Sequence, residues 1–256
     1  MGLFDKKYCG VCGQKIGLFG NRKLEDANLC KDCAAKLSPW FSDRRQSTLA
    51  EIKDQLAYRE ANKDKVAAFH PTLTLGKSTK VLIDEDAERF IVTSARNWQD
   101  ANPDVIDFAD VTGCELDINE SKRELKTKDA QGNQVSYNPP RYEFSHDFYC
   151  EINLNNPYFN QIRFRINPST IHSEATAVNR FRAVSAPLTV EYQECKDVGE
   201  QIKRALLDVR QKARDAVAAA AAANEPKKPV VCPFCGATTT PNASGCCEYC
   251  GGAVDG

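Results

Sequence analysis

Cysteine spacing constrains this chain more than any other feature of its sequence. Eight of the twelve cysteines form four Cys-x-x-Cys pairs, two pairs near each end of the 256 residues. Two thiolates at this spacing can reach one zinc ion where the backbone turns tightly, and four thiolates complete its tetrahedral shell. The sequence therefore predicts two zinc ions as cofactors. The predicted ligands are Cys9, Cys12, Cys30 and Cys33 at the first site, and Cys232, Cys235, Cys247 and Cys250 at the second.

The sequence around these pairs favours metal over disulfide bonds. The opening residues MGLFDKKYCG contain no apolar run typical of a secretory signal. No stretch of the chain approaches the roughly 20 apolar residues of a membrane-spanning helix. We therefore expect a cytoplasmic location, where reducing conditions keep thiols free to bind metal. Disulfides, iron and iron–sulfur clusters are the alternatives to zinc.

A glycine follows the second cysteine in three of the four pairs: CGVCG, CPFCG and CEYCG. Glycine permits positive φ, so the turn can curl and point backbone N–H groups at the sulfurs. The pair Cys30–Cys33 lacks this glycine and runs into helix-forming residues, which places Cys33 at a helix N-terminus. Cys246 is a second candidate beside Cys247, but Cys247 restores the glycine-terminated pattern and is preferred.

Both predicted sites are structural, because four thiolates leave no open position for water or substrate. Zinc binding of about 10–16 kcal/mol is comparable with the stability of a whole domain. We therefore expect each small module to unfold without its metal. The first site resembles a treble-clef finger, with a knuckle, a hairpin and a short helix. The second, with two knuckles, resembles a zinc ribbon.

The predicted organisation is that of an α+β multidomain protein. Residues 1–46 form the N-terminal zinc finger, and residues 47–68 form a connecting helix that opens with a capping box at Thr48 and Glu51. The second half of this helix is nearly all charged, so we expect a solvated connector that projects into water or bridges to the next domain. The apolar positions of its first half share one face: Leu49, Ile52 and Leu56.

Residues 69–223 are predicted to form a central antiparallel β domain with a C-terminal helix. Strand-like runs are separated by turn-forming residues. These runs are Lys80–Ile83, Phe90–Thr93, Val105–Phe108, Cys114–Ile118, Tyr149–Leu154 and Ile162–Ile166. Apolar residues then recur every three or four positions within residues 195–223, which predicts an amphipathic helix that covers the sheet. The recurring residues are Val198, Ile202, Leu206, Val209 and Ala213.

The order of these elements resembles the pleckstrin-homology-like architecture. The similar segments are the hairpin KVLIDEDAERFIV, the strand pair IDFADVTGCELDI and the closing helix VGEQIKRALLDVRQ. Beyond them the alanine-rich helix is broken at Pro226, and residues 224–229 form an exposed linker. Residues 230–256, the predicted zinc ribbon, are then an independently tethered module.

The opening stretch also resembles an uncharacterised bacterial family that is defined by a four-cysteine N-terminal domain. The matching features are its four cysteines, the segments KIG and NRKL, and the run LSPWFSDRR. The resemblance covers about the first fifth of the chain. It implies a bacterial intracellular protein with a zinc-binding N-terminus, and it brings no activity.

The remaining candidate residues do not form a catalytic set. Cys114, Cys150 and Cys195 are isolated in or beside predicted core elements and are expected to be buried. His146 and Cys150 would share one strand face, but no third orienting group is apparent. The chain has no P-loop, Rossmann glycine pattern, nucleophile elbow or HExxH motif. We therefore predict that it is not an enzyme.

Charge is balanced, with a formal net charge of −1, so no global basic field predicts nucleic acid or anionic lipid as partner. The finger is locally basic, but its acidic residues are interleaved with the basic ones. Trp40 and Phe41, beside Arg44 and Arg45, are the best nucleic-acid cluster, although a small core under the finger is the favoured interpretation. The basic residues are Lys6, Lys7, Lys15, Arg22, Lys23, Lys31, Lys36, Arg44 and Arg45.

The leading hypothesis is a non-enzymatic adaptor that presents the surfaces of its three modules to protein partners. One alternative is nucleic-acid or ribosome-associated binding through the zinc fingers. The other is peripheral membrane binding through the pleckstrin-homology-like domain.

Overall fold

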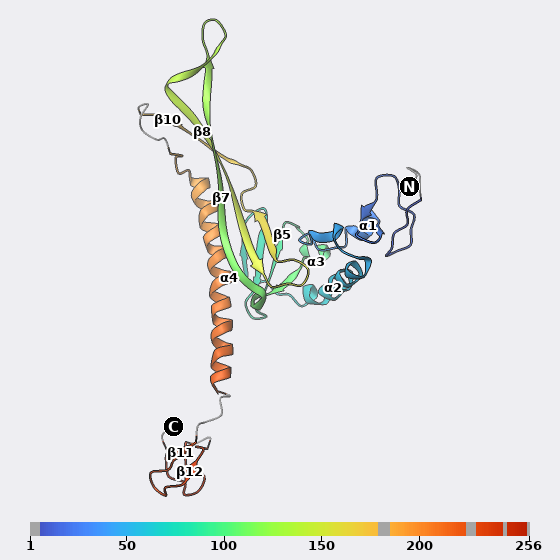
Figure 1. The fold of residues 1–256 in the computed structure, drawn as a ribbon. Helices are drawn as coiled ribbons and strands as arrows, with labels where there is room; N and C mark the ends of the chain where they lie inside the picture. Colours follow the sequence, from blue (N-terminus) through green and yellow to red (C-terminus); the bar gives the residue numbers. More distant parts are fainter. Residues whose placement is uncertain (1–5, 179–184, 224–228, 243–244, 255–256) are drawn as a thin grey trace. The chain divides into compact units, whose positions relative to one another are not determined.

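The computed structural model describes residues 6–178, 185–223, 229–242 and 245–254 (Figure 1). The chain divides into two compact units, Met1–Arg210 and Gln211–Gly256. The first contains the first cysteine set and the central strands, and the second contains the second cysteine set. The architecture is mixed α/β with several antiparallel sheets.

The N-terminal part of the first unit is a small finger. Strands β1 (Arg22–Lys23) and β2 (Asn28–Leu29) pair as a hairpin, followed by helix α1 (Lys31–Ala34) and the 3₁₀ helix η1 (Asp43–Arg45). The core of the finger combines three of its cysteines with apolar side chains. Its buried members are Cys9, Ile16, Leu24, Leu29, Cys30, Cys33, Leu37 and Ile52.

Helix α2 (Leu49–Ala67) begins as the sequence predicts. Thr48 is its N-cap, and the backbone N–H of Thr48 donates to Glu51 Oε2 at 2.7 Å, which confirms the capping box. Leu49, Ile52 and Leu56 pack on the finger core, as their spacing predicts.

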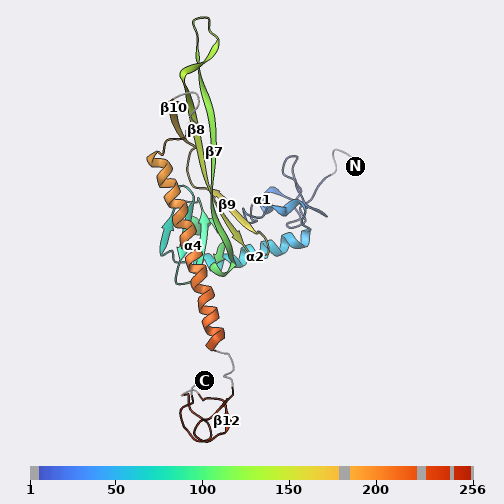
Figure 2. The ribbon, with the colours of Figure 1, turned by 60° about the vertical axis from the view of Figure 1, so that its left-hand side comes forward.

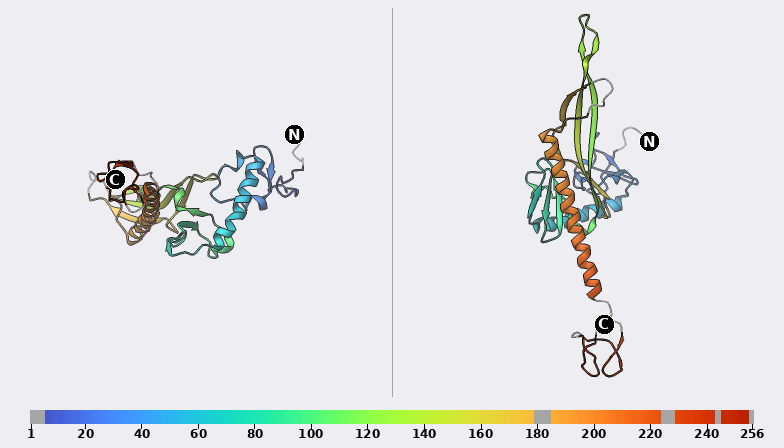
Figure 3. Two further views of the ribbon diagram at one scale, coloured as in Figure 1. Left: turned by 90° about the horizontal axis from the view of Figure 1, so that it is seen from below. Right: turned by 90° about the vertical axis from the view of Figure 1, so that its left-hand side faces the viewer.

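The second half of α2 bridges to the first sheet, which was one of the two expectations, but the expectation that it is solvated is wrong. Arg59, Asn62 and Val66 are buried there, and Gln55 is buried in the first half. Asn62 Nδ2 donates to the carbonyl of Pro103 at 2.7 Å, and Asn62 Oδ1 accepts from the N–H of Val105 at 2.9 Å. All of these buried residues except Val66 are polar, so apolar periodicity could not reveal their burial. Helix α2 therefore runs from the finger to the first sheet (Figure 3, left).

The first sheet is a meander in the order β3 (Leu73–Leu75), β4 (Lys80–Asp84), β5 (Arg89–Thr93) and β6 (Val105–Asp107). Both faces of β4 and β5 are buried, which explains their continuous apolar runs. One face carries Leu82 and Ile91, which pack with Val66 and Phe69 at the end of α2. The opposite face joins the main core.

The second sheet is built on a long hairpin of β7 (Val111–Lys128) and β8 (Gln134–Leu154). Strands β9 (Gln161–Arg165) and β10 (Ile171–Thr176) pair one after the other along the other edge of β8. Every second residue of β8 from Phe144 to Leu154 is buried. The distal parts of β7 and β8 extend beyond the other strands (Figure 1).

The six predicted strands overlap β4 to β9, and the structure adds β3, β10 and the distal halves of β7 and β8. Two short helical segments separate the sheets along the chain: α3 (Trp98–Ala101), and η2 (Phe108–Asp110) directly before β7. One core joins both sheets and includes Phe90, Phe148 and Ile162. Trp40 packs against this core and not under the finger, which corrects half of the prediction for the Trp40–Phe41 pair.

Helix α4 (Val190–Ala223) crosses the second sheet, as Figure 2 shows. Ile202 and Leu206 are buried in the main core and Val198 packs against it, so three of the predicted apolar positions are confirmed. The side chains of Val209 and Ala213 lie outside the described residues. A Cβ at Gly199 would stand 2.5 Å from Leu116 Cδ1, so glycine permits the close approach of helix and sheet here.

The second unit contains the short strands β11 (Val230–Val231) and β12 (Thr238–Thr239), which pair as a hairpin. Its small core consists of Cys232, Cys247 and Val254. Most of the predicted linker, residues 224–228, lies outside the described residues.

Candidate metal centres

The first candidate centre opens on a tight knuckle at Cys9 and Cys12. The N–H of Gly13 donates to the carbonyl of Cys9 at 2.8 Å, and the N–H of Cys9 donates to the carbonyl of Gln14 at 2.9 Å. Gly13 has a φ of 71°, which glycine adopts without steric cost. The glycine predicted to end this knuckle therefore has the predicted role.

The second half of this centre lies at the start of α1. Cys30 is the N-cap of the helix, and its Sγ accepts from the N–H of Cys33 at 3.3 Å. Cys33 lies at the N-terminus of this helix, as predicted, and Cys30 is its N-cap. Cys33 is buried in the first turn. Backbone donors at a helix start stabilise thiolate charge.

These elements bring the four predicted thiols of the finger together. The Sγ atoms of Cys9, Cys12, Cys30 and Cys33 all lie within 4.8 Å of one another. Cys12 Sγ and Cys30 Sγ are 3.8 Å apart, too far for a disulfide bond of about 2.05 Å. A tetrahedron of sulfurs at about 2.3 Å from a central zinc has edges of about 3.8 Å. The observed separation fits such a shell.

The pKa values of two thiols in this centre, Cys9 and Cys33, are shifted in opposite directions. Burial raises the pKa of Cys9, but N–H groups of Cys12, Cys30 and Val11 outweigh it and lower the pKa to about 6. Burial raises the pKa of Cys33, and its thiol neighbours raise it further. Ionisation of Cys33 is thus disfavoured beside the other thiols, and a bound divalent cation would favour its thiolate.

The second centre is made from two knuckles with the same backbone pattern. Gly236 N–H donates to the Cys232 carbonyl and Gly251 N–H donates to the Cys247 carbonyl, each at 2.9 Å. The φ values of the two glycines are 74° and 71°. Cys232 N–H and Cys247 N–H also donate at 2.9 Å to carbonyls that lie five residues further along the chain. The two knuckles therefore have the same backbone hydrogen-bond pattern and the same glycine conformation.

The second set of predicted thiols is also brought together. The Sγ atoms of Cys232, Cys235, Cys247 and Cys250 lie within 4.8 Å of one another. Cys232 Sγ is 3.6 Å from Cys250 Sγ, and Cys235 Sγ is 3.8 Å from Cys247 Sγ. The set includes Cys247 and not its neighbour Cys246, which forms a β-bridge with Ala253.

A family match covers part of the first unit. Residues 7–55 match a family described as a domain of unknown function (DUF4428). The match spans the finger, all four of its cysteines and the first turns of α2. No curated protein matches the chain, and no solved structure matches it. The chain therefore contains an uncharacterised domain with a four-cysteine group that could hold a metal ion.

The cysteines outside the two centres have different environments. Cys114 and Cys150 are buried in the main core, as predicted, with their Sγ atoms 3.7 Å apart. Cys195 is only half-buried, so the prediction of burial is wrong for it. His146 Nε2 lies 3.0 Å from Glu120 Oε2, a neighbour that the sequence did not identify. The ring of His146 packs edge-on against Tyr192 at a centroid distance of 5.0 Å.

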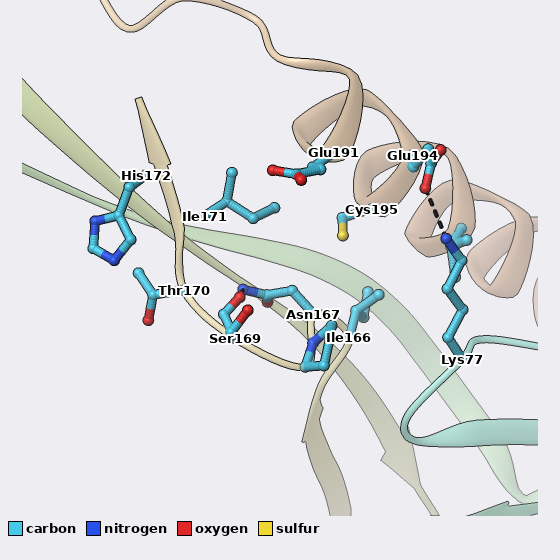
Figure 4. A pocket seen from close by; sticks show the side chains of 12 residues that line it. Lys77, Ile166, Asn167, Ser169, Thr170, Ile171, His172, Glu191, Glu194 and Cys195 are labelled. Carbon is cyan, nitrogen blue, oxygen red and sulfur yellow. Dashed lines mark hydrogen bonds and ion pairs between the residues drawn. The ribbon is translucent and has the colours of Figure 1, made fainter. Parts of the chain in front are cut away.

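Cys195 lines a pocket of about 430 Å³ between α4 and the turn that joins β9 to β10 (Figure 4). Ile166, Ile171 and Val198 contribute apolar surface. At one side Lys77 Nζ pairs with Glu194 Oε2 at 2.7 Å. Burial raises the pKa of the Cys195 thiol, which disfavours the thiolate that a nucleophile requires.

None of the described helices is both long enough and apolar enough to cross a membrane.

Proposed function

We propose that the protein is a non-enzymatic interaction protein whose two four-cysteine centres each hold a structural zinc ion. One observation carries this proposal. In both centres four thiols converge within 4.8 Å of one another, and the sulfur pairs Cys12–Cys30, Cys232–Cys250 and Cys235–Cys247, at 3.6–3.8 Å, fit the edges of a zinc–thiolate tetrahedron. Cys9, Cys12, Cys30 and Cys33 would hold the first ion, and Cys232, Cys235, Cys247 and Cys250 the second.

The chemistry of the donors supports zinc and a structural role. Four sulfur ligands suit zinc better than magnesium or calcium, which prefer oxygen. A four-thiolate shell is closed, so the ion would fix the knuckles without activating water. We interpret the finger as treble-clef-like and the second unit as a zinc ribbon, because their knuckles and hairpins have those arrangements.

Two features support a central domain of pleckstrin-homology-like type. Two antiparallel sheets share one core, and a C-terminal helix packs into that core through Ile202 and Leu206. Such a fold presents binding surfaces on many scaffolds and does not specify a ligand. We therefore assign the central domain an interaction role beside the two zinc modules, in a bacterial cytoplasmic protein.

A protein partner is supported by exposed aromatic side chains on the second unit. Phe234 and Tyr249 occupy the third position of equivalent knuckles and are 71% and 72% exposed. Exposed aromatic residues on a rigid turn supply much of the binding energy in protein interfaces. The two rings thus offer matched contact points on a module that the metal would hold rigid.

Metal counting tests the proposal. The wild-type protein, purified without chelator, should contain two zinc ions per chain, and Cys9→Ser and Cys232→Ser should each contain one. Cys195→Ser is the matched control, because it removes a thiol outside both centres and should leave two ions. A wild-type protein without zinc, or with iron in its place, would refute the assignment.

A further inference from the structure

One turn of the finger exposes two large apolar side chains, Leu18 and Phe19, to solvent; we call it the apolar tip. Gly17, Leu18, Phe19 and Gly20 form a turn in which the N–H of Gly20 donates to the carbonyl of Gly17 at 3.0 Å. Leu18 is 84% exposed and Phe19 is 89% exposed, more than any other large apolar residue among those described. Turns usually place polar residues or glycine at these central positions.

Four cations of the finger lie together at one open depression, which begins next to this turn in the chain. Arg22, Lys23, Arg44 and Arg45 line an open depression of about 790 Å³. Within the described part of the chain none of the four forms an ion pair with a carboxylate. Glu25 also lines the depression and leaves a net excess of positive charge.

The cations are held together by the fold of the finger. Arg44 Nη1 donates to the carbonyl of Lys23 at 2.8 Å, and Arg22 Nη1 donates to the carbonyl of Phe19 at 3.3 Å. The second bond ties the basic cluster to the apolar tip. Burial lowers the pKa of Arg44, and repulsion from Arg45 and Arg22 lowers it further. An external anion would remove this repulsion.

We propose that the finger docks on an anionic phospholipid surface, with Leu18 and Phe19 inserted among the lipids and the four cations against the phosphates. Cations beside an apolar tip match the layers of such an interface, in which apolar groups lie below charged headgroups. The site lies on the finger and not on the central domain. This membrane proposal rests on the proposed function in one respect: the finger must be folded around its zinc ion.

The tip distinguishes a lipid surface from the two other macromolecules that attract cations. Nucleic acid would use Phe19 as a stacking platform, but Leu18 has no aromatic face to offer a base. A folded protein partner needs roughly 800 Å² on each side of an interface, whereas this tip is a two-residue projection. A fluid bilayer can surround a small apolar projection such as Leu18 and Phe19, because its lipids rearrange around the inserted side chains.

Vesicle flotation tests the proposal. The full-length protein should float with vesicles of phosphatidylcholine and phosphatidylglycerol, and should remain unbound with phosphatidylcholine alone. Lys23→Gln/Arg45→Gln removes the two exposed cations of the cluster and should weaken binding about 25-fold, since each cation near an anionic surface contributes a factor of about 5. Leu18→Ser/Phe19→Ser should weaken binding at least about 10-fold through lost apolar burial.

Matched variants control for charge and hydrophobicity. Lys31→Gln/Lys53→Gln removes two exposed cations elsewhere in the finger and α2, and Val178→Ser/Leu188→Ser removes two apolar side chains outside the finger at 81% and 74% exposure. Both controls should bind as the wild type does. Equal losses in the controls and the site variants would overturn the proposal.

Zinc content, measured on the same samples, separates this proposal from the previous one. A zinc-loaded wild type that fails to float with anionic vesicles overturns the membrane site and leaves the zinc centres standing. A wild type that shifts single-stranded RNA and ignores the vesicles assigns the cluster to nucleic acid, and also overturns the proposal. Flotation lost only in the site variants, at unchanged zinc content, supports it.

Discussion

Backbone register, at the scale of single residues, distinguishes two adjacent cysteines in the second unit. Cys247 N–H donates to the carbonyl of Gly252, and Gly251 N–H donates back to the carbonyl of Cys247. These bonds wrap a turn around the Cys247 sulfur. Cys246 N–H donates to Asn242 Oδ1 at 2.9 Å, in a neighbouring turn.

We therefore predict different results for the two serine substitutions. Cys247→Ser should lower the zinc content from two ions to one per chain, because it removes a ligand from a closed shell. Cys246→Ser should keep both ions, and it serves as the adjacent control. The measurement is metal analysis of desalted protein. Loss of zinc in Cys246→Ser with retention in Cys247→Ser would reverse the assignment.

A buried ion pair connects α2 to the first sheet. Arg59 Nη1 lies 2.7 Å from Asp104 Oδ1, and the Ser38 hydroxyl donates to Asp104 Oδ2 at 2.7 Å. Burial raises the pKa of the Asp104 carboxyl, although Arg59 and Ser38 lower it. Desolvation thus outweighs attraction at this carboxyl, which is typical of buried pairs.

Removing one partner of this buried ion pair should strongly reduce the free energy of unfolding. Asp104→Ala should reduce the free energy of unfolding by about 3–5 kcal/mol, since Arg59 would remain buried without its partner. The double variant Arg59→Leu/Asp104→Leu should lose less unfolding free energy than Asp104→Ala, because it leaves no unpaired charge in the interior. Urea unfolding measures both. Glu60→Ala, which breaks the exposed Lys63–Glu60 pair, is the control and should change stability far less. An equal loss in the control would contradict the prediction.

At the scale of elements, the predictability of a segment depended on whether its buried face was apolar. The start of α2 was predictable from Thr48 and Glu51, because a capping box is a local pattern. Its second half was not, because Arg59 and Asn62 are buried by polar contacts with residues more than 40 positions away. Sequence periodicity detects apolar stripes and cannot detect such a polar one.

The long hairpin shows the same limit. Its proximal parts were predicted because residues such as Phe148 and Ile152 alternate with polar ones over the core. Its distal parts were missed because SKRELKTK and QVSYNPPRYE have no buried face to produce a pattern. The four-cysteine groups, by contrast, were fully predictable in membership, since ligand spacing is a local requirement of the metal. The Leu18–Phe19 tip was missed because exposure is not encoded locally.

The N-cap of α2, Thr48, should contribute to the stability of the first unit. Thr48→Ala should destabilise the first unit by about 1 kcal/mol, because the N–H of Glu51 loses its side-chain acceptor. Denaturant unfolding with zinc present is the measurement. Thr74→Ala, an exposed threonine in β3, is the matched control, and no loss beyond that of the control would contradict the role of the cap.

At the scale of the whole molecule, the division into Met1–Arg210 and Gln211–Gly256 predicts separate unfolding. A chain ending at Pro229 should keep one zinc ion and the thermal midpoint of the first unit, because the core of the second unit is its own. Calorimetry of the full and shortened chains tests this. A midpoint lowered by the truncation would show that the units stabilise each other.

Helix α2 joins the finger to the first sheet in one cooperative element. Ile52 packs in the finger, whereas Val66 packs against Leu82 and Ile91 of the sheet. A ligand that binds only the folded finger should therefore raise the free energy needed to open the sheet, and a more stable sheet should in turn tighten metal binding. The backbone amides of β4 and β5 would then report metal supply, exchanging hydrogen slowly in zinc-replete protein and quickly in starved protein.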